Sequence, residues 1–249
     1  MQAASGTAEI DLVFPQNDTY APAHIIPVAF AFQNSELASY LQPTVVFRIY
    51  PYDNYSHAIA IGDFDMTWIN WTSSDPYIEY GEALETLNTE GTWLLEWELS
   101  VTSCPSSGDL KPTADTTRYQ MVFTTKNGAK EPDLTAATNG DMCSGALNFT
   151  FKITDTLDSG DLFENGKPCA VLAETTPTPT PCAAKIEPSA ASSISAYLTH
   201  RACAVQTDPA SWCPEPKDDG ARRMVIPSLA MGGAAFLAAA VSGLGFFMI

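Results

Sequence analysis

Residues 92–101 alternate apolar and polar side chains over the length of one β-strand. Successive side chains of a strand point to opposite faces, so this segment has one apolar face and one mostly polar face. The apolar series is Trp93, Leu95, Trp97, Leu99 and Val101, and the opposite series includes Glu96 and Glu98. An antiparallel sheet with one face on a core and the other in water has this pattern. We therefore expect Trp93 and Trp97 to be buried and Glu96 and Glu98 to face solvent.

Six more runs in the first 172 residues have the same period of two, and Gly, Pro, Asn and Asp separate them. The runs are Ala8/Ile10/Leu12/Phe14, Ile26/Val28/Phe30/Phe32, Val45/Phe47/Ile49, Phe64/Met66/Trp68, Tyr119/Met121/Phe123 and Leu147/Phe149/Phe151/Ile153. Seven half-buried strands, a turn signal at Asn127-Gly128 and no long helical period between them are typical of two packed sheets. The sequence therefore predicts an all-β chain with an Ig-like antiparallel β-sandwich over residues 1–172, and a β-barrel is the second choice. Phe47 and Phe149 should share the core with the two tryptophans.

The composition changes in residues 173–181, where threonine and proline alternate. Alternating proline excludes a helix and favours extended polyproline II, so we expect a stiff linker whose threonines are either O-glycosylated or unmodified. Residues 182–214 follow as a segment bracketed by cysteines, in which the spacing of Ile194, Tyr197 and Leu198 predicts a short amphipathic helix. This segment is too small for a core of its own, so it should dock on the sandwich or be held by a disulfide.

The hydrophobic C-terminal tail, residues 224–249, contains no charged side chain and is long enough to span a membrane. A polar spacer, residues 215–223, precedes it and offers small residues for cleavage, which is typical of a glycosylphosphatidylinositol (GPI) anchor signal. The candidate attachment residues are Asp218, Asp219, Gly220 and Ala221. We therefore expect the chain to be attached to a membrane through a GPI anchor.

Two other topologies share this tail. A retained transmembrane helix in an exported protein would leave Arg222 and Arg223 outside the cytosol, against the positive-inside tendency. A tail anchor on a cytosolic protein would satisfy that tendency, and the first residues lack the basic patch and apolar run of a signal peptide. The cytosolic tail anchor is therefore the main alternative, whereas the cysteines and the glycosylation motifs favour export.

Six cysteines form an even set without the spacing of a zinc site. They are Cys104, Cys143, Cys169, Cys182, Cys203 and Cys213. We expect disulfides, which persist in oxidising compartments. Cys104 and Cys143 flank neighbouring strand regions, so the sequence favours this pair and leaves the other four unassigned. The three histidines, His24, His57 and His200, are widely separated, and we expect no metal and no cofactor.

Four acceptor motifs for N-glycosylation are present, at Asn17, Asn54, Asn70 and Asn148. Asn148 and Thr150 lie on the polar face of a predicted strand whose other face is apolar. A glycan at Asn148 should therefore point to solvent. The four motifs predict a glycoprotein of the secretory pathway.

Two parts of the chain are similar to a known family. The first is EIDLVFPQNDTYAP at residues 9–22 with IPVAFAFQN at 26–34, and the second is CAVL at 169–172, TPTPTPC at 176–182 and AASSIS at 190–195. They resemble an uncharacterised family of fungal secreted, GPI-anchored proteins, the domain of unknown function 7136. The resemblance covers residues 7–214. It implies export and a fungal surface context, and it carries over no catalytic residue.

Charge and motifs exclude several functions. The net charge of -17 repels phosphate backbones, so nucleic acid is not an expected partner. The sequence has no GxSxG, HExxH or Walker-type loop. Glu96 with Glu98, and Asp63 with Asp65, are carboxylate pairs of the kind that glycoside hydrolysis needs, but a solvated sheet face explains both more simply.

Aromatic residues in predicted loops offer an alternative function. Tyr50, Tyr52, Tyr55, Trp71, Tyr77 and Tyr80 could stack on sugar rings if they gather on one rim, although aromatics of this kind more often cap a core. The sequence therefore predicts a non-enzymatic cell-surface or cell-wall glycoprotein, with cell-wall polysaccharide as a conceivable partner. A carbohydrate-binding module is the second interpretation and a glycoside hydrolase the third.

Overall fold

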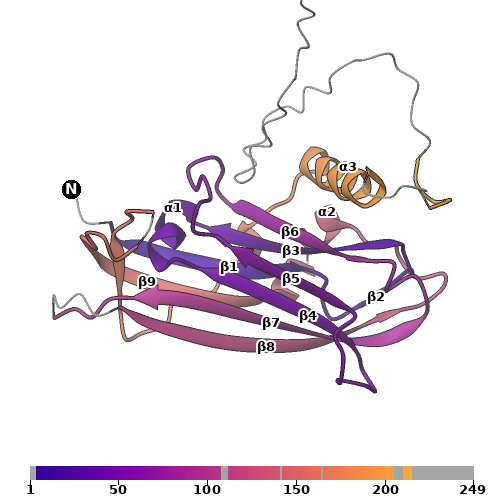
Figure 1. Cartoon of the computed structure of the whole chain (residues 1–249), viewed down its shortest axis with the longest axis horizontal. Helices are drawn as coiled ribbons and strands as arrows, with labels where there is room; N and C mark the ends of the chain where they lie inside the picture. Colours follow the sequence, from indigo (N-terminus) through magenta and orange to yellow (C-terminus); the bar gives the residue numbers. More distant parts are fainter. Residues whose placement is uncertain (1–3, 108–111, 141, 164, 205–209, 215–249) are drawn as a thin grey trace, which may run out of the picture.

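The computed structural model describes residues 4–107, 112–140, 142–163, 165–204 and 210–214. These residues form two five-stranded sheets that pack face to face (Figure 1). In order across the sheet, sheet A contains β10 (Cys169–Leu172), β9 (Leu147–Leu157), β1 (Gly6–Phe14), β3 (Ile25–Gln33) and β6 (Tyr77–Leu84). Sheet B contains β2 (Thr19–Tyr20), β8 (Thr113–Thr125), β7 (Gly91–Ser103), β4 (Thr44–Pro51) and β5 (Ala60–Asp65). The predicted all-β sandwich is confirmed.

All strand pairs within the sheets are antiparallel except the short pair of β2 with β8, which is parallel. Six of the seven predicted runs fall on strands. Of the run Phe64/Met66/Trp68 only Phe64 does, because β5 ends at Asp65; Met66 lies beyond it but is buried, and Trp68 is 66% exposed. The predicted turn is present: Gly128 has a φ of +78°, a left-handed conformation that glycine adopts at little cost. This turn follows β8 and leads toward the short helix α2 (Leu134–Ala137).

The core lies between the sheets and is centred on Trp97, which is fully buried. The Trp97 ring is 4.8 Å from the ring of Phe149 and 5.2 Å from that of Phe30. Phe47 and Trp93 are also buried, whereas Phe149 is half-buried at the margin of this core, so the predicted register of β7 is correct. Each aromatic pair of this kind stabilises the fold by about 0.5–1.5 kcal/mol beyond the contribution of the apolar area that it buries.

The expectation that Glu96 faces open solvent is wrong. Glu96 does lie on the outer face of β7, opposite Trp97, but only 8% of it is exposed. Arg48 on β4 and Arg118 and Gln120 on β8 surround its carboxylate, as described below. Period two therefore placed the side chain on the correct face but could not show what covers it.

All six cysteines are paired in disulfides. The pairs are Cys104–Cys169, Cys143–Cys182 and Cys203–Cys213. The expected pair of Cys104 with Cys143 is therefore wrong. Cys104 follows β7 and lies beside β10, where its N–H donates to Ala170 O at 2.8 Å. The pairing follows from which segments the sandwich brings together, and β10 was absent from the predicted strands.

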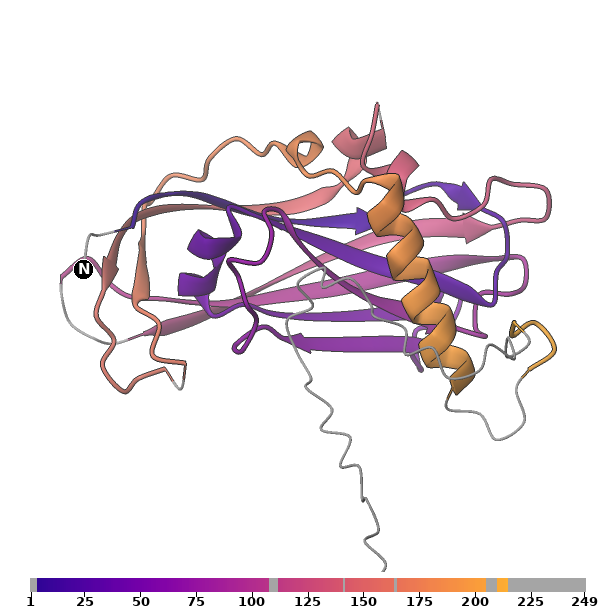
Figure 2. The ribbon, with the colours of Figure 1, turned by 90° about the horizontal axis from the view of Figure 1, so that it is seen from above.

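Residues 173–181, called the strap below, run over sheet A and are joined to it by hydrogen bonds. Ala173 N–H donates to Lys152 O at 2.8 Å, and Thr150 Oγ1 donates to Pro177 O at 2.9 Å. The Cys143–Cys182 disulfide holds the far end, next to the 3-10 helix η3 (Pro181–Ala183). The strap is thus an extended segment laid on the sandwich (Figure 2).

Helix α3 (Pro188–Ala204) covers another part of the same outer face (Figures 1 and 2). It buries Ile194, Leu198 and Ala202 against the sandwich, where it contacts β3 and β6. The spacing of Ile194 and Leu198 agrees with the predicted amphipathic helix, while Tyr197 remains 37% exposed. The segment after the sandwich therefore docks and also carries a disulfide.

The remaining short helices are α1 (Ser35–Ala38), η1 (Ser39–Leu41) and η2 (Met142–Gly145). Among the described residues, no helix has the length and apolarity needed to cross a membrane. The predicted spacer 215–223, the tail 224–249 and the attachment candidates Asp218, Asp219, Gly220 and Ala221 lie outside the described residues.

Candidate functional site

The outer face of sheet B carries a cluster of four charged side chains, Arg48, Glu96, Glu98 and Arg118. Glu98 Oε1 accepts from Arg48 Nη1 at 2.9 Å and from Arg118 Nη2 at 2.5 Å. Glu96 lies 3.7 Å from the Arg48 guanidinium and 3.8 Å from that of Arg118. Gln120 Nε2 completes the set by donating to Glu96 Oε2 at 2.7 Å. Two carboxylates and two guanidinium groups thus neutralise one another on adjacent strands.

This arrangement does not favour the hydrolase interpretation. A general acid and a base for glycoside hydrolysis face each other across a substrate, and their environments hold their pKa values apart. Glu96 and Glu98 instead share the same two arginines. Asp65, from the other predicted pair, accepts from Thr67 N–H at 2.9 Å, and hydrogen bonds from Thr67 lower its pKa below the ordinary value. Both pairs are explained as structural carboxylates.

A hollow with a volume of about 790 Å³ extends from the outer face of sheet B, beside the charged cluster, to the start of β9 in sheet A. Its lining residues are Asn17, Tyr52, Tyr55, Leu94, Gln120, Met121, Val122, Gly145 and Leu147. None of these nine carries a charge, although the chain has a net charge of -17. Apolar carbon, two phenol rings and two amides are combined in one site, which suits a neutral ligand with both apolar and hydroxyl groups.

Three of the six predicted sugar-stacking aromatics gather near this hollow. Tyr55 lies between Tyr50 and Tyr52, with ring centroids 6.4 and 6.3 Å away, and Tyr52 and Tyr55 are about half exposed. The other three lie elsewhere. Trp71 and Tyr77 are buried against Phe32, and the ring of Tyr80 meets that of Tyr197 on α3. The six rings therefore do not form a single platform. Three tyrosines remain near the hollow, Tyr50 at the end of β4 and Tyr52 and Tyr55 in the β4–β5 loop.

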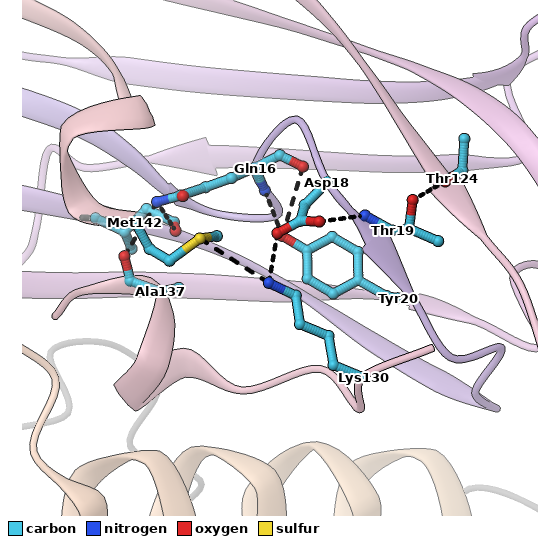
Figure 3. A network of polar contacts seen from close by, with 9 residues as sticks. Gln16, Asp18, Thr19, Tyr20, Thr124, Lys130, Ala137 and Met142 are labelled. Atoms are coloured by element: carbon cyan, nitrogen blue, oxygen red, sulfur yellow. Dashed lines mark hydrogen bonds and ion pairs between the residues drawn. The ribbon is translucent and has the colours of Figure 1, made fainter. Parts of the chain in front are cut away.

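A network of hydrogen bonds fixes the loop that carries Asn17 (Figure 3). On one side, Gln16 is buried: its N–H donates to Tyr20 Oη at 3.0 Å, and its amide donates to Ala137 O at 3.1 Å. Burial raises the pKa of Tyr20 to about 12, so this hydroxyl stays protonated. On the other side, Asp18 O accepts from Thr124 N–H at 3.0 Å.

The Asp18 side chain adds an ion pair to the same network. Its carboxylate pairs with Lys130, whose ammonium also lies 5.4 Å from the centre of the Tyr20 ring. Partial burial opposes ionisation of Asp18, but hydrogen bonds from Lys130 and from Thr19 N–H outweigh it and hold its pKa below the ordinary value. Both neighbours of Asn17 are therefore anchored, while the Asn17 side chain is exposed at the hollow.

The glycosylation motifs differ in their surroundings. Asn17, Asn54 and Asn70 are exposed. Asn148 is half-buried, and its amide donates to Ala146 O at 3.1 Å. The hydroxyl of Thr150, the third residue of that motif, is bonded to the strap. The strand face that carries Asn148, which was expected to face solvent, thus lies beside the strap.

A pair of buried carboxyl groups, Glu9 and Asp11, lies under the strap on β1. Glu9 accepts from the N–H of Thr180 at 2.8 and 2.9 Å and from its hydroxyl at 3.1 Å. Asp11 is fully buried and accepts from Gln33 Nε2 at 2.8 Å, while its Oδ1 lacks a partner. Burial raises the pKa of Asp11 to about 8, against the hydrogen bond from Gln33, and the neighbouring Glu9 raises it further. The strap therefore covers a carboxyl group that is protonated at neutral pH.

Similarity to known proteins identifies the family of the chain. The family model described as a domain of unknown function (DUF7136) matches residues 3–213. The chain belongs to this family. A search of curated proteins finds no match. Within the part of the chain that the structure describes, no group of three or more His, Cys, Asp or Glu side chains could hold a metal ion. Membership of DUF7136 assigns no activity, so function has to be argued from the surface itself.

Sequence reasoning did not find the hollow, although one signal was available. Leu94 is the apolar exception in the outward series of β7, and Val122 is a second apolar outward residue on β8. Two apolar residues on the solvent side of paired strands indicate a surface that something covers. The contribution of Gly145 and Leu147 could not have been foreseen, because they belong to a segment far away in the sequence.

Proposed function

We propose that this protein is an exported, N-glycosylated, disulfide-bonded surface protein without an enzymatic activity of its own. The observation that carries the proposal is the state of the cysteines, all six of which are paired. Two of the three bridges close loops of 65 and 39 residues, so they tie together segments far apart in the sequence. Disulfides of this kind form and persist in oxidising compartments.

Two further features support the proposal. Three glycosylation motifs place their asparagines on exposed surface, as a protein of the secretory pathway requires. The sequence of residues 215–249 has the organisation of a GPI-anchor signal, and the proposed attachment site is among Asp218, Asp219, Gly220 and Ala221. We further propose that the protein resides on the outer face of the plasma membrane or in the cell wall, in a fungal context.

The proposal is tested on the endogenous protein in intact cells. We expect a phospholipase that cuts GPI anchors to release it, an N-glycosidase to increase its mobility on a gel, and thiol reagents to label it only after reduction. A chain stopped after Ala221 should appear in the medium. A protein that is reduced, unglycosylated and digested by protease only from the cytosolic side would instead be the cytosolic tail-anchored form.

Binding of a neutral oligosaccharide is the second candidate function, and the uncharged hollow with Tyr52 and Tyr55 favours it. The purified ectodomain, freed of its own N-glycans, should bind members of a glycan array, and Tyr52→Ala should reduce that binding. Trp71→Ala is unsuitable for this test, because Trp71 belongs to the core. The hydrolase interpretation would need measurable hydrolysis that Glu96→Gln abolishes.

A further inference from the structure

We propose that the hollow on sheet B is the seat of the chain's own N-linked glycan at Asn17. The inference rests on the proposed export and glycosylation, and it names the occupant of the hollow. Asn17 is itself one of the nine lining residues, so the first sugar of a glycan at this position starts inside the hollow.

The chemistry of the lining fits this occupant. A sugar ring presents an apolar face of C–H groups and a rim of hydroxyls, and it carries no charge. Leu94, Val122 and Leu147 supply apolar contact, the exposed rings of Tyr52 and Tyr55 supply flat surfaces, and the amide of Gln120 supplies polar partners. The charged cluster lies outside the lining except where Gln120 links the two.

The covalent link to Asn17 explains how weak contacts between the glycan and the lining residues can keep the hollow occupied. A tethered group has an effective concentration in the millimolar range, so it can occupy a site that the same sugar in solution would leave mostly empty. The tether is also positioned in advance, because Gln16 and the Asp18–Lys130 pair hold both neighbours of Asn17 in place (Figure 3). Little ordering of the backbone therefore opposes the contact.

Of the other exposed motifs, Asn70 serves as the internal reference, because Asn54 lies between Tyr52 and Tyr55 in the sequence. Asn54 lies on the β4–β5 loop and accepts hydrogen bonds from the N–H and hydroxyl of Ser56, and Asn70 accepts from the hydroxyl of Thr72. Neither asparagine lines the hollow. We therefore expect the glycan at Asn70 to extend into solvent, while the glycan at Asn17 packs on the protein.

The experiment measures how fast an endoglycosidase trims each glycan of the folded, glycosylated full-length chain, with site-resolved mass spectrometry of the peptides. Trimming at Asn17 should be about tenfold slower than at Asn70, the ratio that corresponds to a contact free energy of about 1.4 kcal/mol. The double variant Tyr52→Ser/Tyr55→Ser keeps all four motifs and should abolish the difference without changing the occupancy of Asn17. Tyr197→Ser, which removes an exposed tyrosine on α3, should leave the difference intact.

A second variant tests the same contact without an enzyme. Asn17→Gln removes the glycan, so it should increase the fluorescence of a dye that binds apolar surface, whereas Thr19→Ser keeps the motif and should not. Equal trimming rates at Asn17 and Asn70 would overturn the inference and leave export intact. Glycans at Asn54 and Asn70 with none at Asn17 would also overturn it and would leave the hollow to a free oligosaccharide. If no motif carries a glycan, the proposed function itself fails.

Discussion

The two sheets have similar strands but very different outer faces. On sheet A, the strap and α3 cover the carboxyl groups of Glu9, Asp11 and Glu82. On sheet B, Glu96 and Glu98 are covered only by side chains of neighbouring strands, and the face carries the hollow. The difference arises from the strap and α3, which lie on sheet A and leave sheet B to solvent or to a ligand (Figure 2).

The comparison shows that the covering segment, and not the strand, sets the chemistry of an acidic side chain. Asp11 has a pKa raised to about 8 by burial. Burial also raises the pKa of Glu82, although its ion pair with Arg201 on α3, at 2.7 Å, lowers it in part. A carboxylate under a cover is costly unless a partner comes with it. On sheet B the two carboxylates share Arg48 and Arg118, whose side chains are 31% and 57% exposed and can exchange contacts with water.

The largest expected effect comes from loosening the cover on sheet A. Leu198 on α3 is 1% exposed, so Leu198→Ala should lower the free energy of unfolding by about 2–5 kcal/mol. Urea unfolding followed by tryptophan fluorescence measures the change. Ala196→Ser, at an exposed position of the same helix, is the control and should change stability by less than about 0.5 kcal/mol. A small effect of Leu198→Ala would mean that α3 does not stabilise the sandwich.

The second effect is a pH dependence of stability. The unfolded Asp11 carboxyl loses its proton near its ordinary pKa of 3.8, whereas the folded one keeps it to about 8. The folded state therefore binds the extra proton between these values, and the free energy of unfolding falls as the pH rises through this window. Between pH 5 and pH 8, Asp11 should lower the free energy of unfolding of the parent chain by about 2–4 kcal/mol, at about 1.4 kcal/mol for each pH unit. Asp11→Asn should remove this decrease.

Urea unfolding of Asp11→Asn and the parent chain at both pH values measures this difference. Asp63→Asn, on the exposed outer edge of sheet B, is the matched control and should leave the decline unchanged. Parallel pH profiles for Asp11→Asn and the parent would show that Asp11 is ionised beneath the strap.

The same substitution on both faces gives the third test. Arg201→Ala leaves Glu82, whose side chain is 6% exposed, without its ion-pair partner, and should cost about 1–3 kcal/mol. Arg118→Ala leaves Glu98 paired with Arg48 at 2.9 Å, and should cost less than about 0.5 kcal/mol. Thermal unfolding at one salt concentration compares the two. Equal costs would remove the distinction between the faces.

The smallest effect concerns a single hydroxyl. Thr180→Val keeps the shape of the side chain and the N–H contacts to Glu9 but loses the hydroxyl bond at 3.1 Å, so it should cost about 1 kcal/mol. Thr178→Val, at an exposed position of the strap, should be neutral. Proteolysis of the native protein within the strap provides a second measurement, because a loosened strap is cut faster. No difference between the two variants would mean that the Thr180 hydroxyl does not help to hold the strap.

Regular alternation made much of the sandwich predictable, and its absence explains what was missed. The core and the register of β7 follow from period two alone. Strand β6 was not predicted, because Glu79 and Gly81 lie on its inward side while Ile78 and Tyr80 lie on the side that α3 approaches. Strand β10 is only four residues long and is buried on both sides, so its sequence does not alternate apolar and polar residues and gives no strand signal.

The covered surfaces were beyond sequence reasoning for a different reason. Glu9 and Asp11 occupy outward positions of β1, which the alternation assigns to solvent, yet the strap buries them. A threonine- and proline-rich segment is compatible with a free linker or a docked one, and only the contacts of Thr180 and Pro177 decide. The pairs Cys104–Cys169 and Cys143–Cys182 likewise depend on segments that only the fold brings together, which sequence order does not encode.

The most direct test of the proposed export is mass spectrometry of the endogenous protein, alkylated before any reduction and then treated with N-glycosidase in heavy-oxygen water. We expect linked peptides for Cys104–Cys169, Cys143–Cys182 and Cys203–Cys213, together with labelled aspartate at the positions of Asn17, Asn54 and Asn70. Alkylated cysteines throughout and unlabelled asparagine at every motif would contradict export and place the protein in a reducing compartment.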